Sequence, residues 1–326
     1  MKRNKSLILL LIVIISALAL TACSSEPKVN EKEPIEETST DVDTTNVDTT
    51  VTVKHELDEV TVNKNPKNVI VFDYGVLDTL DKMGIEVLGL PKSNIPSYLE
   101  KYNDDKYVDI GTLFEPNFEK IFELKPDIII ISGRQAKVYD ELKKLAPTLY
   151  LSIDGANYID SFENNMKILG EVFDKEDFIE KEIKNIQDSI KSLNEKAAAD
   201  GKSTLIVMAN DGNLSAYGEG SRFGIIHKEF GLTPVDKDIE VSNHGKKISF
   251  EYIVEQNPDY LFVIDRGVVV GADTSAQQVL NNDLIKSTTA YKNDKIIYLD
   301  AQVWYVSSGG LTGTMKMIEE VKSALE

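Results

Sequence analysis

The sequence of 326 residues contains few of the side chains from which catalytic and metal sites are usually built. Cysteine occurs once, as Cys23, which excludes an internal disulfide and a thiolate metal cluster. The 3 histidines, His55, His227 and His244, are too scattered for a zinc or manganese site made only of protein ligands. The Walker A motif and the Gly-x-Ser-x-Gly elbow are both absent. These absences predict that the chain has no catalytic activity and no intrinsic cofactor.

Positive charge is scarce as well. The chain has 54 acidic and 36 basic residues and a formal net charge of −18, which argues against nucleic acid or an anionic membrane surface as its main partner. Only four of the basic residues are arginines, namely Arg3, Arg134, Arg222 and Arg266. Because lysine supplies the general surface charge, the retention of arginine suggests that its planar, forked guanidinium group is required. Alternatively, the arginines are chance survivors of a biased composition.

No hydrophobic run is long enough to span a bilayer comfortably. The longest, residues 7–20, follows a basic start and covers about fourteen residues. It leads into Leu20-Thr21-Ala22-Cys23, which resembles the lipobox of bacterial lipoproteins. This pattern predicts a signal peptide over residues 1–22. The resemblance implies that Cys23 is lipidated and anchors the mature chain on the extracytoplasmic face of the cell membrane. The alternative is an ordinary secretory signal followed by a chance cysteine.

Large apolar residues are almost missing from the next stretch, which is rich in Glu, Asp, Thr, Ser and Pro. Such a segment buries too little surface to offset the entropy that it would lose on ordering. We therefore predict that residues 23–50 form a lipidated, disordered acidic tether. As a flexible coil, the tether would reach roughly 30 Å on average.

The chain contains an internal repeat. Residues 118–134 read FEKIFELKPDIIIISGR and residues 250–266 read FEYIVEQNPDYLFVIDR, and seven of seventeen positions are identical at an offset of 132 without a gap. Each copy is typical of a helix, a Pro-Asp turn, a buried strand and then an arginine. Two copies predict two similar lobes. Arg134 and Arg266 are then expected just beyond the carboxyl end of a strand, where open α/β sheets bind their ligands.

Short apolar runs alternate with helical segments, which predicts an α/β fold with parallel-rich sheets. The two lobes are expected at residues 51–173 and 201–326. Between them, residues 174–200 carry a single apolar stripe and predict one long rigid helix that joins the lobes. Asp174 is expected to be its N-cap, and Gly201 lies just beyond its end. The alternative is a surface helix packed on one lobe.

Three predicted loops of the second lobe carry candidate site residues. Residues 210–224 are expected to form a glycine-rich loop that holds Arg222. His244 lies in a polar loop directly before the second repeat copy, which favours a position at the cleft over an incidental one. Tyr305 follows the single tryptophan, Trp304, in a loop before the closing helix.

The leader, the hairpin predicted over residues 51–62, the two Pro-Asp units and the long helix together resemble the substrate-binding lipoproteins of ABC importers for ferric siderophores. The resemblance extends from about residue 51 to the C-terminus. It is strongest to the catecholate binders, including the petrobactin-type and enterobactin-type receptors, because Ser132-Gly133-Arg134-Gln135-Ala136-Lys137 matches their first-lobe arginine motif. It implies a periplasmic-binding-protein-like fold with a helical backbone. It also implies a monomer that captures an Fe(III)–siderophore complex, petrobactin-like, and delivers it to an ABC permease.

The resemblance implies a set of ligand-binding residues. Arg134, Arg222 and Arg266 match the three cleft arginines of the family, and Lys137 is expected to add positive charge. A ferric centre with three catecholates is strongly anionic, so arginines converging from both lobes would match its charge. Their planar groups also suit the aromatic rings of the catecholates.

Two further pairs of residues match functional positions of the family. His244 and Tyr305 match a pair that binds iron directly where the siderophore leaves two coordination sites open. Fe³⁺ favours oxygen donors, so a tyrosine phenolate is a suitable completing ligand and an imidazole an acceptable one. Alternatively, both side chains only line the cleft or pack under a loop. Glu119 and Glu251 match the acidic residues, one in each lobe, that dock on the permease, and the helix dipole would also favour carboxylates there.

The sequence leaves three alternative functions to consider. A binder of another large chelate, such as haem, cobalamin or a hydroxamate siderophore, would share the fold, although three cleft arginines favour a polyanion over cobalamin. A cell-wall hydrolase would need a nucleophile and a base, and the sequence offers no such pair. A surface adhesin without a small ligand would leave the matched arginines unexplained.

Overall fold

The computed structural model describes residues 49–326. The predicted signal peptide, Cys23 and nearly all of the predicted tether lie outside this range. The described residues belong to one compact unit. Among them, no helix combines the length and the hydropathy that a bilayer span requires.

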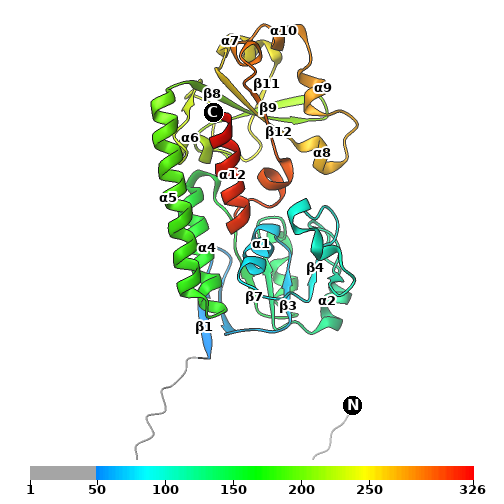
Figure 1. Ribbon diagram of the computed structural model, residues 1–326. Coiled ribbons are helices and arrows are strands. Elements are labelled where there is room, and N and C mark those ends of the chain that lie inside the picture. Colours follow the sequence, from blue (N-terminus) through cyan, green and yellow to red (C-terminus); the bar gives the residue numbers. More distant parts are fainter. Residues whose placement is uncertain (1–48) are drawn as a thin grey trace, which may run out of the picture. The chain divides into compact units, whose positions relative to one another are not determined.

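The first lobe is built on a sheet of five parallel strands in the order β5-β4-β3-β6-β7 (Figure 1). The strands are β3 (Val69–Val71), β4 (Gly89–Leu90), β5 (Val108–Asp109), β6 (Ile128–Ile131) and β7 (Thr148–Tyr150). All four isoleucines of β6 are buried, as expected of a central strand covered on both faces. A separate antiparallel hairpin, β1 (Thr50–Lys54) and β2 (Glu59–Asn63), precedes this sheet.

The second lobe has a six-stranded sheet in the order β11-β9-β8-β12-β13, with β10 also paired to β8. The strands are β8 (Ser203–Asn210), β9 (Asn213–Tyr217), β10 (Thr233–Pro234), β11 (Lys246–Ile248), β12 (Tyr260–Asp265) and β13 (Ile296–Leu299). Strands β8, β10, β12 and β13 are parallel to one another, whereas β9 runs antiparallel to β8 and β11. The predicted α/β class with two parallel-rich sheets is confirmed.

One prediction for this lobe is wrong, because residues 210–224 are not a continuous loop. Strand β9 lies within them and forms a hairpin with β8. Asp211 and Gly212 make the turn, with φ of 47° and 78°. Positive φ at both central residues is typical of a tight hairpin turn, and the dipeptide Asp-Gly is a common sequence for it. The high glycine content concealed the alternation of buried residues along β9.

Both repeat copies form the predicted elements. Helix α2 (Phe118–Leu124) precedes β6, and helix α7 (Phe250–Gln256) precedes β12. The remaining helices are α1 (Tyr74–Lys82), α3 (Tyr139–Leu142), α4 (Tyr158–Val172), α5 (Glu176–Asp200), α6 (Ile225–Lys228), α8 (Arg266–Val270), α9 (Ala276–Leu280), α10 (Asp283–Lys286), α11 (Thr289–Lys292) and α12 (Leu311–Ala324).

Helix α5 is the predicted long helix and has 25 residues (Figure 1). Its apolar stripe is buried against α4 and α12, and Gly201 ends it in the left-handed conformation. Its predicted N-cap is wrong, since Lys175 takes that position. Asp174 has a φ of 49°, and the Lys175 N–H donates to the Gly170 carbonyl at 2.8 Å. Asp174 therefore serves the end of α4, and its carboxylate accepts from Lys64 Nζ at 3.1 Å.

Helix α12 packs on α1 of the first lobe and on α5. Its N-cap, Gly310, has no side chain for capping, and two residues of α1 take over this role. The Gly313 N–H donates to Asp78 Oδ2 at 2.8 Å, and the Leu311 N–H donates to Thr79 Oγ1 at 3.3 Å. The C-terminal segment of the chain is therefore fixed to the first lobe as well as to the second. The predicted lobe boundaries stay a prediction.

Candidate functional site

The first-lobe arginine lies in a short loop beyond the carboxyl end of β6. Within this loop, the Ser132 N–H donates to Gln135 Oε1 at 3.1 Å. Ser132 Oγ donates to Asp73 Oδ2 at 2.7 Å, and Arg134 Nη1 lies 3.9 Å from the same carboxylate oxygen. Asp73 also caps α1 by accepting from the N–H groups of Gly75 and Val76. This carboxylate therefore ties the loop that carries Arg134 to the neighbouring strand and helix.

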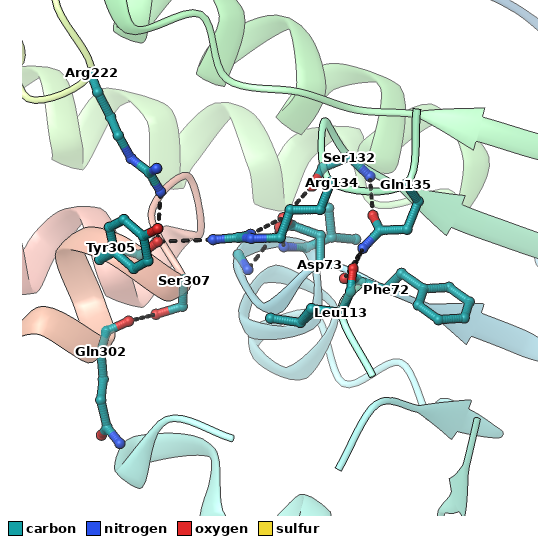
Figure 2. Close-up of polar contacts among 12 residues, drawn as sticks. Phe72, Asp73, Leu113, Ser132, Arg134, Gln135, Arg222, Gln302, Tyr305 and Ser307 are labelled. Carbon is teal, nitrogen blue, oxygen red and sulfur yellow. Dashed lines mark hydrogen bonds and ion pairs between the residues drawn. The ribbon is translucent and has the colours of Figure 1, made fainter. Parts of the chain in front are cut away.

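Arg134 and a second-lobe arginine meet at one main-chain atom. Arg134 Nη2 donates to the Tyr305 carbonyl oxygen at 2.9 Å, and Arg222 Nη2 donates to the same oxygen at 2.7 Å. Figure 2 shows both guanidinium groups directed at Tyr305, Arg222 from above and Arg134 from the right. Arg222 comes from the segment between β9 and α6. A carbonyl oxygen has two lone pairs, so it can accept both donors at once.

Arg266 binds the other end of the same tyrosine. It is the first residue of α8, and its Nε donates to the Tyr305 hydroxyl at 2.8 Å. Its Nη1 donates to Asn210 Oδ1 at 2.7 Å. The guanidinium carbons of Arg222 and Arg266 also lie 4.2 and 5.4 Å from the centre of the Tyr305 ring. All three predicted cleft arginines therefore converge on Tyr305.

Tyr305 lies in a π-helical turn, Gln302–Val306, rather than in the predicted irregular loop. Trp304 Nε1 donates to Glu320 Oε2 at 2.6 Å, so α12 holds this turn from one side. Ser307 Oγ donates to the Gln302 carbonyl at 2.9 Å and accepts from the Tyr98 hydroxyl of the first lobe at 3.0 Å. The turn is therefore restrained by both lobes. Turns of this type are frequent at functional sites.

The electrostatics of the cluster favour an anion. Burial lowers the pKa of the Arg222 guanidinium, and the nearby charge of Arg134 lowers it further. Burial alone would raise the pKa of the Tyr305 phenol. The hydrogen bond from Arg266 and the charges of the three arginines outweigh it, and the pKa of this phenol is lowered. The positive groups thus make ionisation of this phenol easier, because a negative phenolate would lie among them.

A cavity of about 340 Å³ lies beside the cluster. It is lined by residues of both lobes, including Asp73, Ser132, Arg134, Arg222 and His244. Arg266, Tyr305 and Lys137 are not among the lining residues, and Lys137 is exposed on a separate turn. The sequence patterns did not single out Asp73, although it lies two residues after the end of β3 and so at the same edge of the sheet as Arg134.

The other predicted site residues lie apart from the cavity. Glu119 and Glu251 are exposed in the first turns of α2 and α7. A hydrogen bond from the Ser249 side chain lowers the pKa of Glu251. His227 is buried, with Nδ1 at 2.9 Å from the Leu232 carbonyl, as a structural histidine would be. Over residues 49–326, no group of three or more His, Cys, Asp or Glu side chains is arranged to hold a metal ion.

Comparison with known proteins gives consistent matches. A family model described as periplasmic binding protein matches residues 69–303. The petrobactin-binding protein YclQ of Bacillus subtilis is 47% identical over 326 residues, which cover 99% of each chain. Its crystal structure matches with a TM-score of 0.84 at 51% identity, and covers 85% of this chain and 99% of that chain.

Two proteins of other organisms are also similar. The crystal structure of the periplasmic catecholate-siderophore binding protein VctP from Vibrio cholerae matches with a TM-score of 0.80 at 40% identity, over 84% of this chain and 99% of that chain. The ferric-anguibactin-binding protein FatB of Vibrio anguillarum is 33% identical over 316 residues, which cover 95% of each chain.

Proposed function

The chain belongs to the periplasmic binding protein family, and we propose that it captures a ferric catecholate siderophore of the petrobactin type and delivers it to the permease of an ABC importer. The observation that carries the proposal is the convergence of Arg134, Arg222 and Arg266 on Tyr305, beside a cavity that both lobes line. The similarity to petrobactin-binding and catecholate-binding proteins supports the same ligand class.

The arrangement of the arginines suits a large, anionic, aromatic ligand. Arg134 and Arg222 donate to the Tyr305 carbonyl through Nη2, and a guanidinium group has further N–H donors that remain for a ligand. The hydrogen bonds to Tyr305 hold both groups in place before the ligand arrives, which reduces the entropy lost on binding. Planar guanidinium groups also stack on catecholate rings.

Iron is cargo in this proposal, carried within the siderophore. Where the siderophore leaves coordination sites open, His244 and Tyr305 are proposed to bind Fe³⁺ directly. The lowered pKa of the Tyr305 phenol supports this role, since the phenolate is the form that binds iron. Lys137 is proposed only to add positive charge near the cavity.

The remaining parts of the chain fit a transport cycle at a membrane. We propose that lipidated Cys23 anchors a monomer on the extracytoplasmic face of the cell membrane through the tether of residues 23–50. Glu119 and Glu251, one in each lobe, are proposed to dock on the permease. The protein acts as a binder and carries out no catalysis.

The first test is a titration of the domain with ferric siderophores, followed by Trp304 fluorescence. The probes are ferric complexes of a tris-catecholate, a bis-catecholate, a mixed catecholate-citrate and a hydroxamate. We expect saturable quenching by the catecholates. Arg134→Ala, Arg222→Ala and Arg266→Ala should each weaken binding about 30-fold, or about 2 kcal/mol, because each removes a charged donor. The exposed Lys292→Ala is the matched control and should leave affinity unchanged.

A second set of variants separates iron coordination from charge. Tyr305→Phe removes the phenol but keeps the carbonyl that binds Arg134 and Arg222. A preference for the bis-catecholate that is lost in Tyr305→Phe and His244→Ala would support direct iron binding. Absence of quenching by every catecholate, with the domain folded, would reject the catecholate proposal and favour haem or another chelate.

A further inference from the structure

The first lobe exposes two phenylalanine side chains, one on helix α2 with Glu119 and one in the turn that precedes this helix. Phe114 is 70% exposed and Phe122 is 69% exposed, more than any other large hydrophobic side chain among the described residues. Phe122 lies one turn after Glu119 on α2, so the two side chains share a face of the helix. Phe114 lies in the tight turn at residues 111–116, which joins β5 to α2.

Neither ring is needed for the fold. The turn is held by its own backbone, because the Thr112 N–H donates to the Glu115 carbonyl at 3.0 Å. Thr112 Oγ1 also accepts from the Phe114 N–H at 3.2 Å and from the Glu115 N–H at 3.0 Å. Helix α2 is packed through the fully buried Ile121, whereas the ring of Phe122 is exposed. Exposed apolar surface that is rimmed by polar residues is typical of a site that binds a partner.

The second lobe provides a natural comparison. At the repeat offset of 132, Phe122 corresponds to the half-buried Val254, and Phe114 corresponds to the exposed Lys246. The acidic residue is kept, since Glu119 corresponds to Glu251. Both lobes therefore present an acid at the start of an equivalent helix, but only the first lobe exposes phenylalanine rings on that helix and on the turn before it.

We propose that Phe114, Phe122 and Glu119 form an aromatic docking surface for the membrane-embedded permease, with rings inserted into an apolar depression edged by basic side chains. This inference rests on the proposed function. Glu115, Glu119 and Glu123 are all exposed around the rings, whereas Lys120 Nζ donates to the Asp109 carbonyl at 3.1 Å. This acidic setting opposes anionic lipid headgroups and suits a basic protein face. Because the second lobe lacks the rings, this surface would distinguish the first lobe from the second on the permease.

Photo-crosslinking of the full-length, lipid-anchored chain in host cells tests the surface directly. Phe114 or Phe122 is replaced by the photoreactive residue p-benzoylphenylalanine, and Val268 of α8, which is 67% exposed, is the matched control in the second lobe. We expect positions 114 and 122 to cross-link to the permease of an ABC importer, identified by mass spectrometry, about tenfold more than position 268. Cross-links to lipid, to a second copy of the chain or to nothing would overturn the proposal.

Uptake of radioactive iron as the ferric tris-catecholate gives the functional readout. In the double variant Phe114→Ser/Phe122→Ser, ligand affinity should stay within about twofold, because the surface lies outside the cavity lining. Uptake should fall about tenfold, and Val268→Ser should leave uptake unchanged. Unchanged uptake in the double variant, or an equal loss of ligand affinity, would contradict the docking role. If the unmodified domain binds no ferric chelate, the proposed function is wrong. The cross-links still test separately whether the surface contacts a permease.

Discussion

The two repeat copies share their construction in detail. Helices α2 and α7 each have seven residues and are capped by the side chains of Asn117 and Ser249. Both helices end in a left-handed residue, and both are followed by Pro-Asp. The two aspartates, Asp127 and Asp259, each accept a backbone N–H from the segment that opens the neighbouring central strand. Each repeat copy therefore connects an outer helix to two adjacent strands of its sheet.

The copies differ where the strands end. Strand β6 stops at Ile131, and Arg134 follows in a loop, whereas β12 is two residues longer and Arg266 opens a helix directly. The two arginines consequently reach opposite ends of Tyr305, the carbonyl oxygen and the phenol. The shared repeat therefore places both arginines at the cleft, and the local structure after each strand decides which atom of Tyr305 each arginine reaches.

A larger difference lies at the centre of each sheet. Strand β3 is followed by α1, whereas β8 is followed by the hairpin strand β9. The second lobe thereby gains the segment that carries Arg222, and the first lobe gains Asp78 on α1, which caps α12.

The largest effect is expected at Asp78, which has no counterpart in the second lobe. Its side chain is buried, and desolvation raises its pKa to about 6, although the Gly313 and Thr312 hydrogen bonds lower it in part. A carboxyl whose pKa is higher in the folded state stabilises the fold below its unfolded pKa of 3.8, and this contribution is lost as pH rises to about 6. The loss amounts to about 3 kcal/mol.

The variant Asp78→Asn should lack this pH dependence. Guanidinium denaturation between pH 4 and pH 7, followed by Trp304 fluorescence, measures the free energy of unfolding. The wild type should lose stability relative to Asp78→Asn as pH rises, whereas Asp160→Asn, at an exposed carboxylate, should follow the wild type. Parallel curves for the wild type and Asp78→Asn would show that Asp78 does not titrate in this range.

Sequence patterns were sufficient for the parts of the fold that depend on local periodicity. The repeat located β6, β12, Arg134 and Arg266, because helix, turn and strand signals are all local in the sequence. The hairpin strand β9 was missed, since glycines in its flanking segments outweighed a short alternating run. Asp174 was assigned to the wrong helix because the same residue can begin one helix or end another.

The role of the Tyr305 main-chain oxygen could not be predicted from the sequence, for a different reason. Arg134 and Arg222 bind the main-chain oxygen of Tyr305, and every residue has such an oxygen. Its availability depends on the π-helical turn and on contacts from Tyr98 and Glu320. Because these contacts depend on the tertiary fold, no residue pattern near Tyr305 predicts them.

A moderate loss of stability is expected on replacing Asp127 or Asp259, which have the same role in the two repeat copies. Asp127 Oδ2 accepts from the N–H groups of Lys67 and Asn68 at 2.9 and 2.8 Å. Asp259 Oδ2 accepts from the N–H and hydroxyl of Ser203, both at 2.9 Å, in a more buried setting. We expect Asp127→Ala to cost about 1 kcal/mol and Asp259→Ala about 2 kcal/mol of unfolding free energy, because burial strengthens the second set of bonds.

Thermal and denaturant unfolding of both variants would measure these costs. The exposed Asp140→Ala is the control for loss of a carboxylate without bonds to the backbone of a strand. If only one of the two variants lost stability, the aspartate of the other repeat copy would not contribute to the stability of the fold, although its sequence is kept.

The smallest change in stability is expected from glycine at the C-terminal ends of α2 and α7, and it should have opposite signs in the two repeat copies. Lys125 and Asn257 end α2 and α7 with φ of 48° and 43°. The left-handed conformation is costly for lysine, so Lys125→Gly should stabilise the protein by about 0.5 kcal/mol. Asparagine tolerates this conformation, and Asn257 Oδ1 also accepts from the Thr289 N–H at 2.8 Å. Asn257→Gly loses that bond and should destabilise by about 1 kcal/mol. Denaturant midpoints that shift in the same direction for both variants would contradict the predicted difference between the two helix ends.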